Sequence, residues 1–287
     1  MNTEIKKASE IGFCYGVRRA IDILEKAAHD YGSMETLGAV VHNEQVSQRL
    51  QKIGINVIHN VDEIKSKIVA VSSHGVSPLI ESQLQQKSER VIDTTCPFVK
   101  RAQIAARRLA EAGFYVVIYG EAQHPEVKGI LGWAQENGIA ILDVKDLIIP
   151  EKASRRIGIL SQTTQIAENF IQFAKDIIDI TLSKDVEIRI MDTICHDIRK
   201  RQIVSLELAE KVDLMLVVGG HFSANTKRLA ELSSQVTETY LVGTAEEINT
   251  EWLKGKSKIG VTSGASTSEQ TIDDVIKHLT DSKINME

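Results

Sequence analysis

Three short stretches of the sequence each place a cysteine between a predicted strand and a predicted helix. They read Ile11-Gly12-Phe13-Cys14-Tyr15-Gly16-Val17, Asp93-Thr94-Thr95-Cys96-Pro97-Phe98-Val99 and Asp192-Thr193-Ile194-Cys195-His196-Asp197-Ile198. They hold all three cysteines of the 287-residue chain. Because the same strand–cysteine–helix placement recurs, we interpret the chain as three structurally similar α/β units.

Two further features follow each cysteine in the same order. A polar loop stands 28 residues on, and it contains His42, His124 or Ser223. Later in each unit a strand candidate ends in a second polar loop: Ser72-Ser73-His74-Gly75, Ser161-Gln162-Thr163-Thr164, and Thr262-Ser263-Gly264-Ala265-Ser266. Functional loops gather at the carboxyl ends of the strands in open α/β sheets. We therefore expect all nine loops to converge on one central site.

Apolar runs alternate with helix-period segments along the chain, which is typical of parallel α/β sheets. The strand candidates include 68–71, 115–118, 139–142, 157–160 and 214–218, and the helix candidates include 21–29, 99–112, 167–180 and 227–232. The predicted fold class is α/β, with three similar small domains of mainly parallel sheets in a pseudo-threefold trefoil. The domains are expected at 14–95, 96–192 and 193–287, with residues 1–13 adding a strand to the third.

The composition excludes several classes of protein. With 34 basic and 39 acidic residues the formal net charge is −5, which argues against a general affinity for nucleic acid or anionic membranes. No apolar run approaches the roughly 18 residues of a membrane span, and the N-terminal segment lacks the apolar core of a signal peptide. Three cysteines without a close pair argue against a disulfide framework. We expect a cytoplasmic protein, a monomer, with no nucleic-acid or membrane partner.

The cysteines are candidate ligands of one metal centre. Three thiolates at one point are soft ligands, suited to an iron–sulfur cluster, zinc or copper(I). A complete [4Fe–4S] site normally uses four cysteines, so three would leave one iron open to a substrate. The alternative is that each cysteine is simply a small buried apolar residue. The repeated placement favours the metal.

Histidines and small polar side chains gather in the same loops. The candidate ligands are His42, His74, His124, Thr163, Ser223, Asn225 and Ser266. Together with the N-termini of the helices that follow, they suit a phosphate or diphosphate group. The sequence has no P-loop, and Gly219-Gly220 is too weak a signal for a dinucleotide fold, which disfavours a nucleotide. Glu126 is either a proton carrier or a surface loop acid.

Two basic residues stand four and five positions after each cysteine. The pairs are Arg18 and Arg19, Lys100 and Arg101, and Arg199 and Lys200, and Arg201 extends the last pair. The default interpretation is a solvated helix face. The sharper hypothesis is a positive collar that steers an acidic electron carrier to the metal centre.

The motifs together resemble the 4-hydroxy-3-methylbut-2-enyl diphosphate reductase family over almost the whole chain. The marks are Gly12-Phe13-Cys14 with Gly16-Val17, Val41-His42-Asn43, Ser73-His74-Gly75-Val76-Ser77, Asp93-Thr94-Thr95-Cys96-Pro97, His124-Pro125-Glu126-Val127, Gln162-Thr163-Thr164, Ser223 with Asn225, and Gly264-Ala265-Ser266. The resemblance implies one [4Fe–4S] cluster per chain, held by Cys14, Cys96 and Cys195. It implies reductive dehydroxylation of (E)-4-hydroxy-3-methylbut-2-enyl diphosphate to isopentenyl and dimethylallyl diphosphate, the last step of the non-mevalonate isoprenoid pathway.

The resemblance also implies roles for single residues. The substrate hydroxyl would bind the open iron, and Glu126 would deliver protons with the help of Thr163 and His124. The diphosphate would be held by His42, His74, His124, Thr163, Ser223, Asn225 and Ser266. Ferredoxin or flavodoxin would supply the electrons. The chain departs from the family at Ala224, where a serine is frequent, and at Ser268, where a proline is common. Both departures bear on substrate affinity.

Two other classes of protein fit part of the pattern. A non-catalytic iron–sulfur sensor would need the cysteines but not the histidines, the glutamate and the Ser/Asn pair. A zinc hydrolase of phosphoesters would use the same ligands but would be colourless, whereas a [4Fe–4S] protein is brown.

Overall fold

The computed structural model describes residues 3–41, 43–150, 155–181 and 185–284. In this part of the chain the strands form three four-stranded sheets, and every strand pairing is parallel. The predicted α/β class with three small parallel-sheet domains is therefore confirmed.

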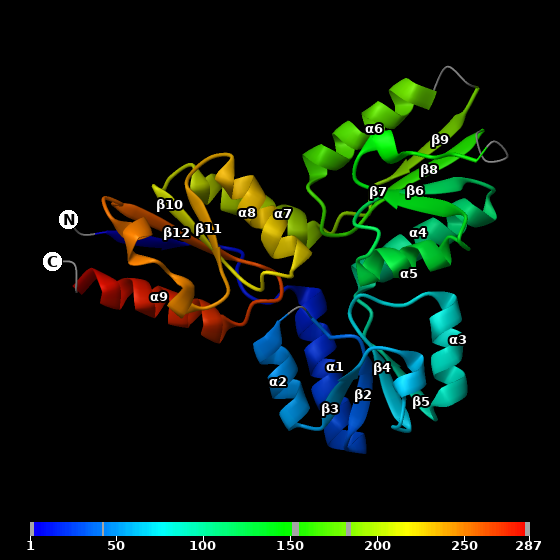
Figure 1. Ribbon diagram of the computed structural model, residues 1–287, viewed down its shortest axis with the longest axis horizontal. Helices are drawn as coiled ribbons and strands as arrows, with labels where there is room; N and C mark the ends of the chain where they lie inside the picture. The colour runs from blue at the N-terminus through cyan, green and yellow to red at the C-terminus, as the bar shows by residue number, and fades with distance from the viewer. Residues whose placement is uncertain (1–2, 42, 151–154, 182–184, 285–287) are drawn as a thin grey trace. The chain divides into compact units, whose positions relative to one another are not determined.

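The three sheets share one strand order (Figure 1). The first contains β2 (Met34–Leu37), β3 (Ile55–Ile58), β4 (Ile68–Val71) and β5 (Arg90–Asp93), in the order β3-β2-β4-β5. The second contains β6 (Tyr115–Tyr119), β7 (Gly138–Ile141), β8 (Arg156–Ser161) and β9 (Glu187–Met191), in the order β7-β6-β8-β9. The third contains β10 (Leu214–Val218), β11 (Thr239–Val242), β12 (Lys258–Ser263) and β1 (Glu4–Lys7), in the order β11-β10-β12-β1. In each sheet the last strand in this order leads into a cysteine.

The helices follow the same repeat. They are α1 (Tyr15–Tyr31), α2 (Glu44–Lys52), α3 (Pro78–Lys87), α4 (Pro97–Glu111), α5 (Pro125–Trp133), α6 (Ala167–Thr181), α7 (His196–Ala209), α8 (Ala224–Ser234) and α9 (Glu269–Ile284). The helices α1, α4 and α7 begin directly after the three cysteines. Short 3-10 turns follow the second strand of each sheet, at Val61–Glu63, Val144–Asp146 and Ala245–Glu247, and a fourth lies at Thr250–Leu253.

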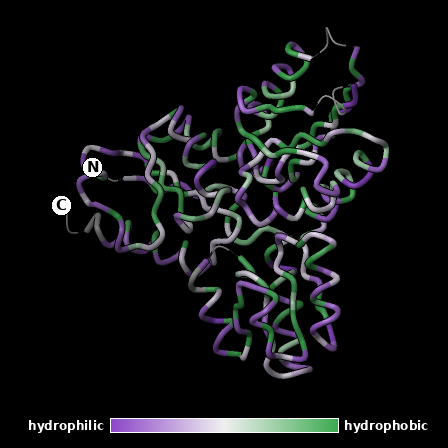
Figure 2. The backbone as a smooth tube through the Cα atoms, turned by 45° about the vertical axis from the view of Figure 1, so that its right-hand side comes forward, coloured by the Kyte–Doolittle hydropathy of each residue, from purple (hydrophilic) through white to green (hydrophobic). Residues whose placement is uncertain are grey.

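Burial on both faces explains why the strands are apolar along their whole length. In β6 the side chains of Val116 and Ile118 pack against α4 and α5 on one face of the sheet. Val117 and its neighbours Tyr115 and Tyr119 pack against α6 on the other face. Figure 2 shows how apolar stretches, in green, alternate with polar stretches, in purple, along the backbone.

The chain divides into two compact units, and each is described by itself. The third-sheet unit comprises Met1–Arg18, Val41–Gln48 and His196–Glu287, and the two-sheet unit comprises Arg19–Val40 and Arg49–Cys195. In the third-sheet unit the N-terminal strand β1 pairs with β12. The domain borders predicted after residues 95 and 192 fall between β5 and α4 and between β9 and α7, and they stay predictions. Among the described helices none has the length and apolar character that crossing a membrane requires.

Candidate active site

The backbone holds the three cysteines in equivalent positions. The N–H of Cys96 donates to the carbonyl of Ser73 at 3.0 Å, and the N–H of Cys195 donates to the carbonyl of Thr163 at 2.9 Å. In the third-sheet unit the N–H of Cys14 donates to the carbonyl of Ala265 at 2.9 Å. Each acceptor lies in the loop after the third strand of its repeat, beside the loop that carries the cysteine.

The thiols are suited to a soft metal. None of the three cysteines is part of a disulfide; Cys195 is buried, and Cys14 and Cys96 are half-buried. Burial raises the pKa of the Cys14 thiol, and backbone hydrogen bonds from Val17 and the charge of Arg201 oppose this rise. A helix N-terminus stabilises a thiolate, and each cysteine directly precedes one. A donor set of three thiols outside any disulfide fits an iron–sulfur cluster. No three His, Cys, Asp or Glu side chains among the described residues form a group that could hold a metal ion.

Arginines fasten the cysteine loops, a role that the sequence analysis missed. Arg19 donates to the carbonyl of Thr95 at 3.2 Å, and Arg101 donates to the carbonyl of Ile194 at 3.3 Å. Each carbonyl belongs to the residue directly before a cysteine. In the third-sheet unit the buried Arg201 donates to the carbonyls of Gly12 at 2.8 Å and Ser263 at 2.9 Å.

The sequence offered only one signal for this role, the recurrence of basic residues at a fixed distance after each cysteine. That recurrence predicted a solvent-facing collar, whereas these three guanidinium groups bond to the backbone. Within the third-sheet unit Lys200, another member of the predicted pairs, forms an ion pair with Glu10.

Glu126 is a buried acid that accepts two hydrogen bonds from Thr163. Only 2% of the residue is exposed. Its Oε1 accepts the N–H of Thr163 at 2.7 Å, and its Oε2 accepts the Thr163 hydroxyl at 2.9 Å. Because the Thr163 carbonyl accepts the N–H of Cys195, one residue connects the carboxylate to a cysteine. The alternative of a surface loop acid is wrong for Glu126.

Two predicted histidines lie side by side in the two-sheet unit. The rings of His74 and His124 are 5.4 Å apart, edge to face. His124 caps α5, where its Nδ1 accepts the N–H of Glu126 at 3.2 Å. An imidazole nitrogen that accepts a hydrogen bond carries no proton, so the ring proton of His124 is on Nε2. The third predicted histidine, His42, lies outside the described residues.

The third-sheet unit collects the other predicted anion ligands. Ser223 and Asn225 follow β10, and Ser266 follows β12, the strand beside it. Ser223 caps α8, so backbone N–H groups of the first helical turn face the loop. Asn225 is 6% exposed, and its Nδ2 has no hydrogen-bond partner among the described residues. A buried donor without a partner at a helix N-terminus suits an anion.

Asn43 is a residue of this region that the ligand prediction omitted. Its Nδ2 donates to the carbonyl of Ser266 at 2.8 Å, and its Oδ1 accepts the N–H of Val46 at 3.0 Å. It therefore joins the loop between β2 and α2 to the loop after β12. The motif Val41-His42-Asn43 was the only signal for it in the sequence.

Comparison of the sequence with known proteins identifies its family. The model of the family described as LytB protein matches residues 5–280. The chain belongs to the LytB family. A LytB relative from Dehalococcoides mccartyi (strain CBDB1), named 4-hydroxy-3-methylbut-2-enyl diphosphate reductase, is 57% identical over 96% of this chain and 97% of its own length. A relative of the same name from Geobacter metallireducens is 40% identical over 96% of both chains.

Solved structures of LytB relatives agree in fold. The E-1-hydroxy-2-methyl-but-2-enyl-4-diphosphate reductase from Plasmodium falciparum is 26% identical and superposes with a TM-score of 0.90, covering 98% of this chain and 89% of its own. A second structure, described as the terminal enzyme of the non-mevalonate pathway, is 35% identical with a TM-score of 0.71 over 97% of this chain and 99% of its own. These similarities support the predicted fold class for this LytB chain as a whole.

Proposed function

We propose that this chain reduces (E)-4-hydroxy-3-methylbut-2-enyl diphosphate to isopentenyl and dimethylallyl diphosphate, the last step of the non-mevalonate isoprenoid pathway. The observation that carries the proposal is the link from Glu126 through Thr163 to Cys195. It ties a buried proton donor to a metal-binding loop, as a reductive dehydroxylation requires. The relatives that carry this reaction in their names favour it over a non-catalytic iron–sulfur sensor.

The reaction consumes two electrons and two protons. The allylic C–O bond breaks, one C–H bond forms, and the oxygen leaves as water. A [4Fe–4S] cluster held by Cys14, Cys96 and Cys195, when bound, supplies the electrons and an open iron for the substrate hydroxyl. Glu126 gives a proton to the departing oxygen. The two hydrogen bonds from Thr163 fix the carboxyl group in position for this transfer.

The diphosphate is held by the remaining loop residues. We assign this role to His42, His74, His124, Thr163, Ser223, Asn225 and Ser266. The Nδ2 group of Asn225, which has no hydrogen-bond partner among the described residues, and the Nε2 proton of His124 support it, because a negatively charged oxygen can accept a hydrogen bond from either. The departure at Ala224 removes one hydroxyl at the start of α8. At the other departure, Ser268 lies just before α9, and its hydroxyl accepts the N–H of Thr271 in the first turn of that helix at 3.1 Å. Ser268 therefore acts as a helix cap.

The electrons come from outside the chain. We propose ferredoxin or flavodoxin as the donor, because the sequence carries no motif for a nicotinamide or flavin cofactor. We also propose that the protein is a cytoplasmic monomer.

Anaerobic purification with an iron and sulfide assay tests the proposal. We expect a brown protein with about four iron and four sulfide ions per chain, which turns over the allylic diphosphate with dithionite as reductant. A colourless protein that stays inactive after cluster reconstitution would refute the proposed function. A colourless protein that instead binds zinc and hydrolyses phosphoesters would identify the zinc-hydrolase alternative.

A further inference from the structure

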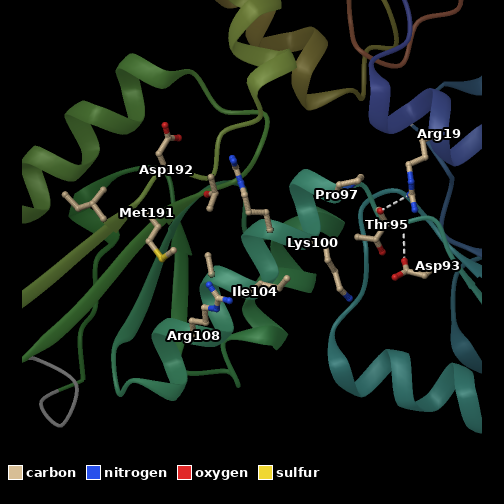
Figure 3. A pocket seen from close by; sticks show the side chains of 13 residues that line it. Arg19, Asp93, Thr95, Pro97, Lys100, Ile104, Arg108, Met191 and Asp192 are labelled. Carbon is tan, nitrogen blue, oxygen red and sulfur yellow. Dashed lines mark hydrogen bonds between the residues drawn. The ribbon is translucent and has the colours of Figure 1, made fainter.

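A groove of about 790 Å³ lies in the two-sheet unit, apart from the residues assigned to the substrate. One wall is a face of α4, from which Lys100, Ile104 and Arg108 project (Figure 3). The opposite wall is the end of the edge strand β9, with Ile190 and Met191. Ile104 and Arg108 of this face are exposed, whereas Ala105, which also lines the groove, belongs to the buried cluster that packs on the sheet.

The groove borders the loops that carry two of the three thiols. Thr95 and Pro97, which flank Cys96, line it, and so does Thr193, two residues before Cys195. Two of its cations, Arg19 and Arg101, are the arginines that donate to the carbonyls directly before these cysteines. The groove is therefore the surface that leads to the backbone of both cysteine loops.

The charge of the groove is opposite in sign to that of the chain. Four cations line it, Arg19, Lys100, Arg101 and Arg108, against two carboxylates, Asp93 and Asp192. Both carboxylates accept backbone N–H groups of the cysteine loops: Asp93 from Thr95 at 2.9 Å, and Asp192 from Ile194 at 3.1 Å. The lining thus has a net positive charge on a protein whose formal net charge is −5.

Apolar side chains are exposed between these charges. Ile104 is 41% exposed and Ile190 is 47% exposed, and both line the groove. A cationic rim around a small apolar centre is typical of surfaces that bind a charged protein weakly and quickly. Short-lived complexes between redox proteins commonly use small interfaces.

We propose that this groove docks an acidic, one-electron carrier protein of low potential. This inference rests on the proposed function. Each substrate molecule takes up two electrons, and the sequence carries no motif for a nicotinamide or flavin cofactor that could supply them. The carrier binds in its reduced form, is oxidised by one electron and leaves, and a second reduced carrier delivers the second electron. Arg19, Lys100 and Arg101 of the predicted collar belong to the groove, and Arg108 extends it along α4.

Charge reversal of Lys100 and Arg108 tests the groove without touching the arginines that hold the cysteine loops. Lys100 lies over the ring of Trp133, 4.8 Å from its centroid, and Arg108 is exposed. The matched control is Arg107→Glu with Lys175→Glu, which changes the net charge equally. Arg107 is the neighbour of Arg108 but pairs with Glu111, and Lys175 lies on α6; neither lines the groove.

Two measurements distinguish binding of the carrier at the groove from the proposed reaction itself. With reduced flavodoxin at low ionic strength, we expect Lys100→Glu/Arg108→Glu to lower kcat/KM for the carrier by about tenfold or more and to flatten its salt dependence. With saturating dithionite the same variant should match the unchanged chain. Calorimetric titration of flavodoxin into the metal-free chain should show weak binding that the groove variant loses and the control retains.

Three results would overturn the inference: an unchanged rate with flavodoxin, an equal loss in the control pair, or a groove variant that converts a dimer of this chain into a monomer. The last would make a second copy the occupant. If the unchanged chain fails with dithionite, the proposed function is refuted, and the calorimetric result alone decides whether the groove binds the acidic carrier.

Discussion

The two units carry different buried polar side chains at the same place in the repeat. Glu126 and Asn225 each stand 30 residues after a cysteine, at the start of a helix that follows the first strand of a sheet. Their neighbouring loops contribute Thr163 and Ala265, whose carbonyls each accept the N–H of a cysteine. The backbone framework is thus the same in both units, and the side chains decide what each site does.

The difference lies in whether the buried polar group is satisfied within the chain. Thr163 donates to both oxygens of Glu126, so that carboxylate is held in a fixed position. Ala265 has no hydroxyl to offer, and Nδ2 of Asn225 has no partner among the described residues. A satisfied acid suits proton transfer at one position, whereas an unsatisfied donor awaits an acceptor from a ligand.

The largest effect should come from removing the acid itself. We expect Glu126→Gln to lower turnover with dithionite by about 100-fold or more, the usual scale of a lost general acid. The iron content should stay normal, because the substitution keeps the size of the side chain and leaves all three cysteines unchanged. The measurement is steady-state turnover together with an iron assay.

A matched control lies in the same loop. Glu121 is an exposed acid, so Glu121→Gln removes an equal charge without removing a buried proton donor. Turnover of that variant should be normal. If Glu126→Gln also turned over normally, the proton-donor role and the contrast between the two units would both be wrong.

The next effect comes from making the loop of Thr163 resemble that of Ala265. Thr163→Ala removes the hydroxyl that donates to Glu126 Oε2 at 2.9 Å and leaves the backbone N–H bond intact. Hydrogen bonds to charged groups contribute about 1.5–3 kcal/mol. We expect the free energy of unfolding of the metal-free chain to fall by about that amount, measured by denaturant titration, with turnover reduced about tenfold or more.

Thr163→Ser distinguishes the hydroxyl from the methyl group. It restores the donor, so most of the stability and turnover should return. An equal loss in the serine and alanine variants would mean that packing of the methyl group, and not the hydrogen bond, fixes Glu126.

The repeat itself could be predicted from the sequence, because each cysteine stands at a change from strand to helix. The predicted strand 157–160 and helix 99–112 lie within about two residues of β8 and α4. The pairing of Glu126 with Thr163 came from a family resemblance, and the structure shows it as two hydrogen bonds from Thr163 to the carboxylate. The arginine contacts could not be predicted, since a basic residue on a helix has the same sequence signature whether it faces solvent or a neighbouring carbonyl.

Which buried donor lacks a partner among the described residues also could not be predicted from the sequence. Asn225 is one polar residue among several in its loop, and nothing in the order of residues says that its Nδ2 has no hydrogen-bond partner within the described part of the chain. That property depends on which loops the neighbouring strands β10 and β12 bring together. It also gives the smallest of the expected effects.

The comparison predicts opposite changes in stability and affinity at Asn225. Asn225→Leu removes a buried Nδ2 group that has no hydrogen-bond partner among the residues described, and leaving such a group unsatisfied costs about 1–3 kcal/mol. The metal-free chain should therefore be no less stable, measured by thermal unfolding. The KM for the allylic diphosphate should rise about tenfold, the loss of roughly one hydrogen bond to a charged group.

Ser233 provides the control, because its hydroxyl is another buried group for which the described part of the chain holds no partner, and it lies at the far end of α8. Ser233→Ala should leave both stability and KM nearly unchanged. A clear fall in stability for Asn225→Leu, with an unchanged KM, would mean that Asn225 holds the loop together as Thr163 does. The two units would then differ in sequence at this position without differing in what the residue does.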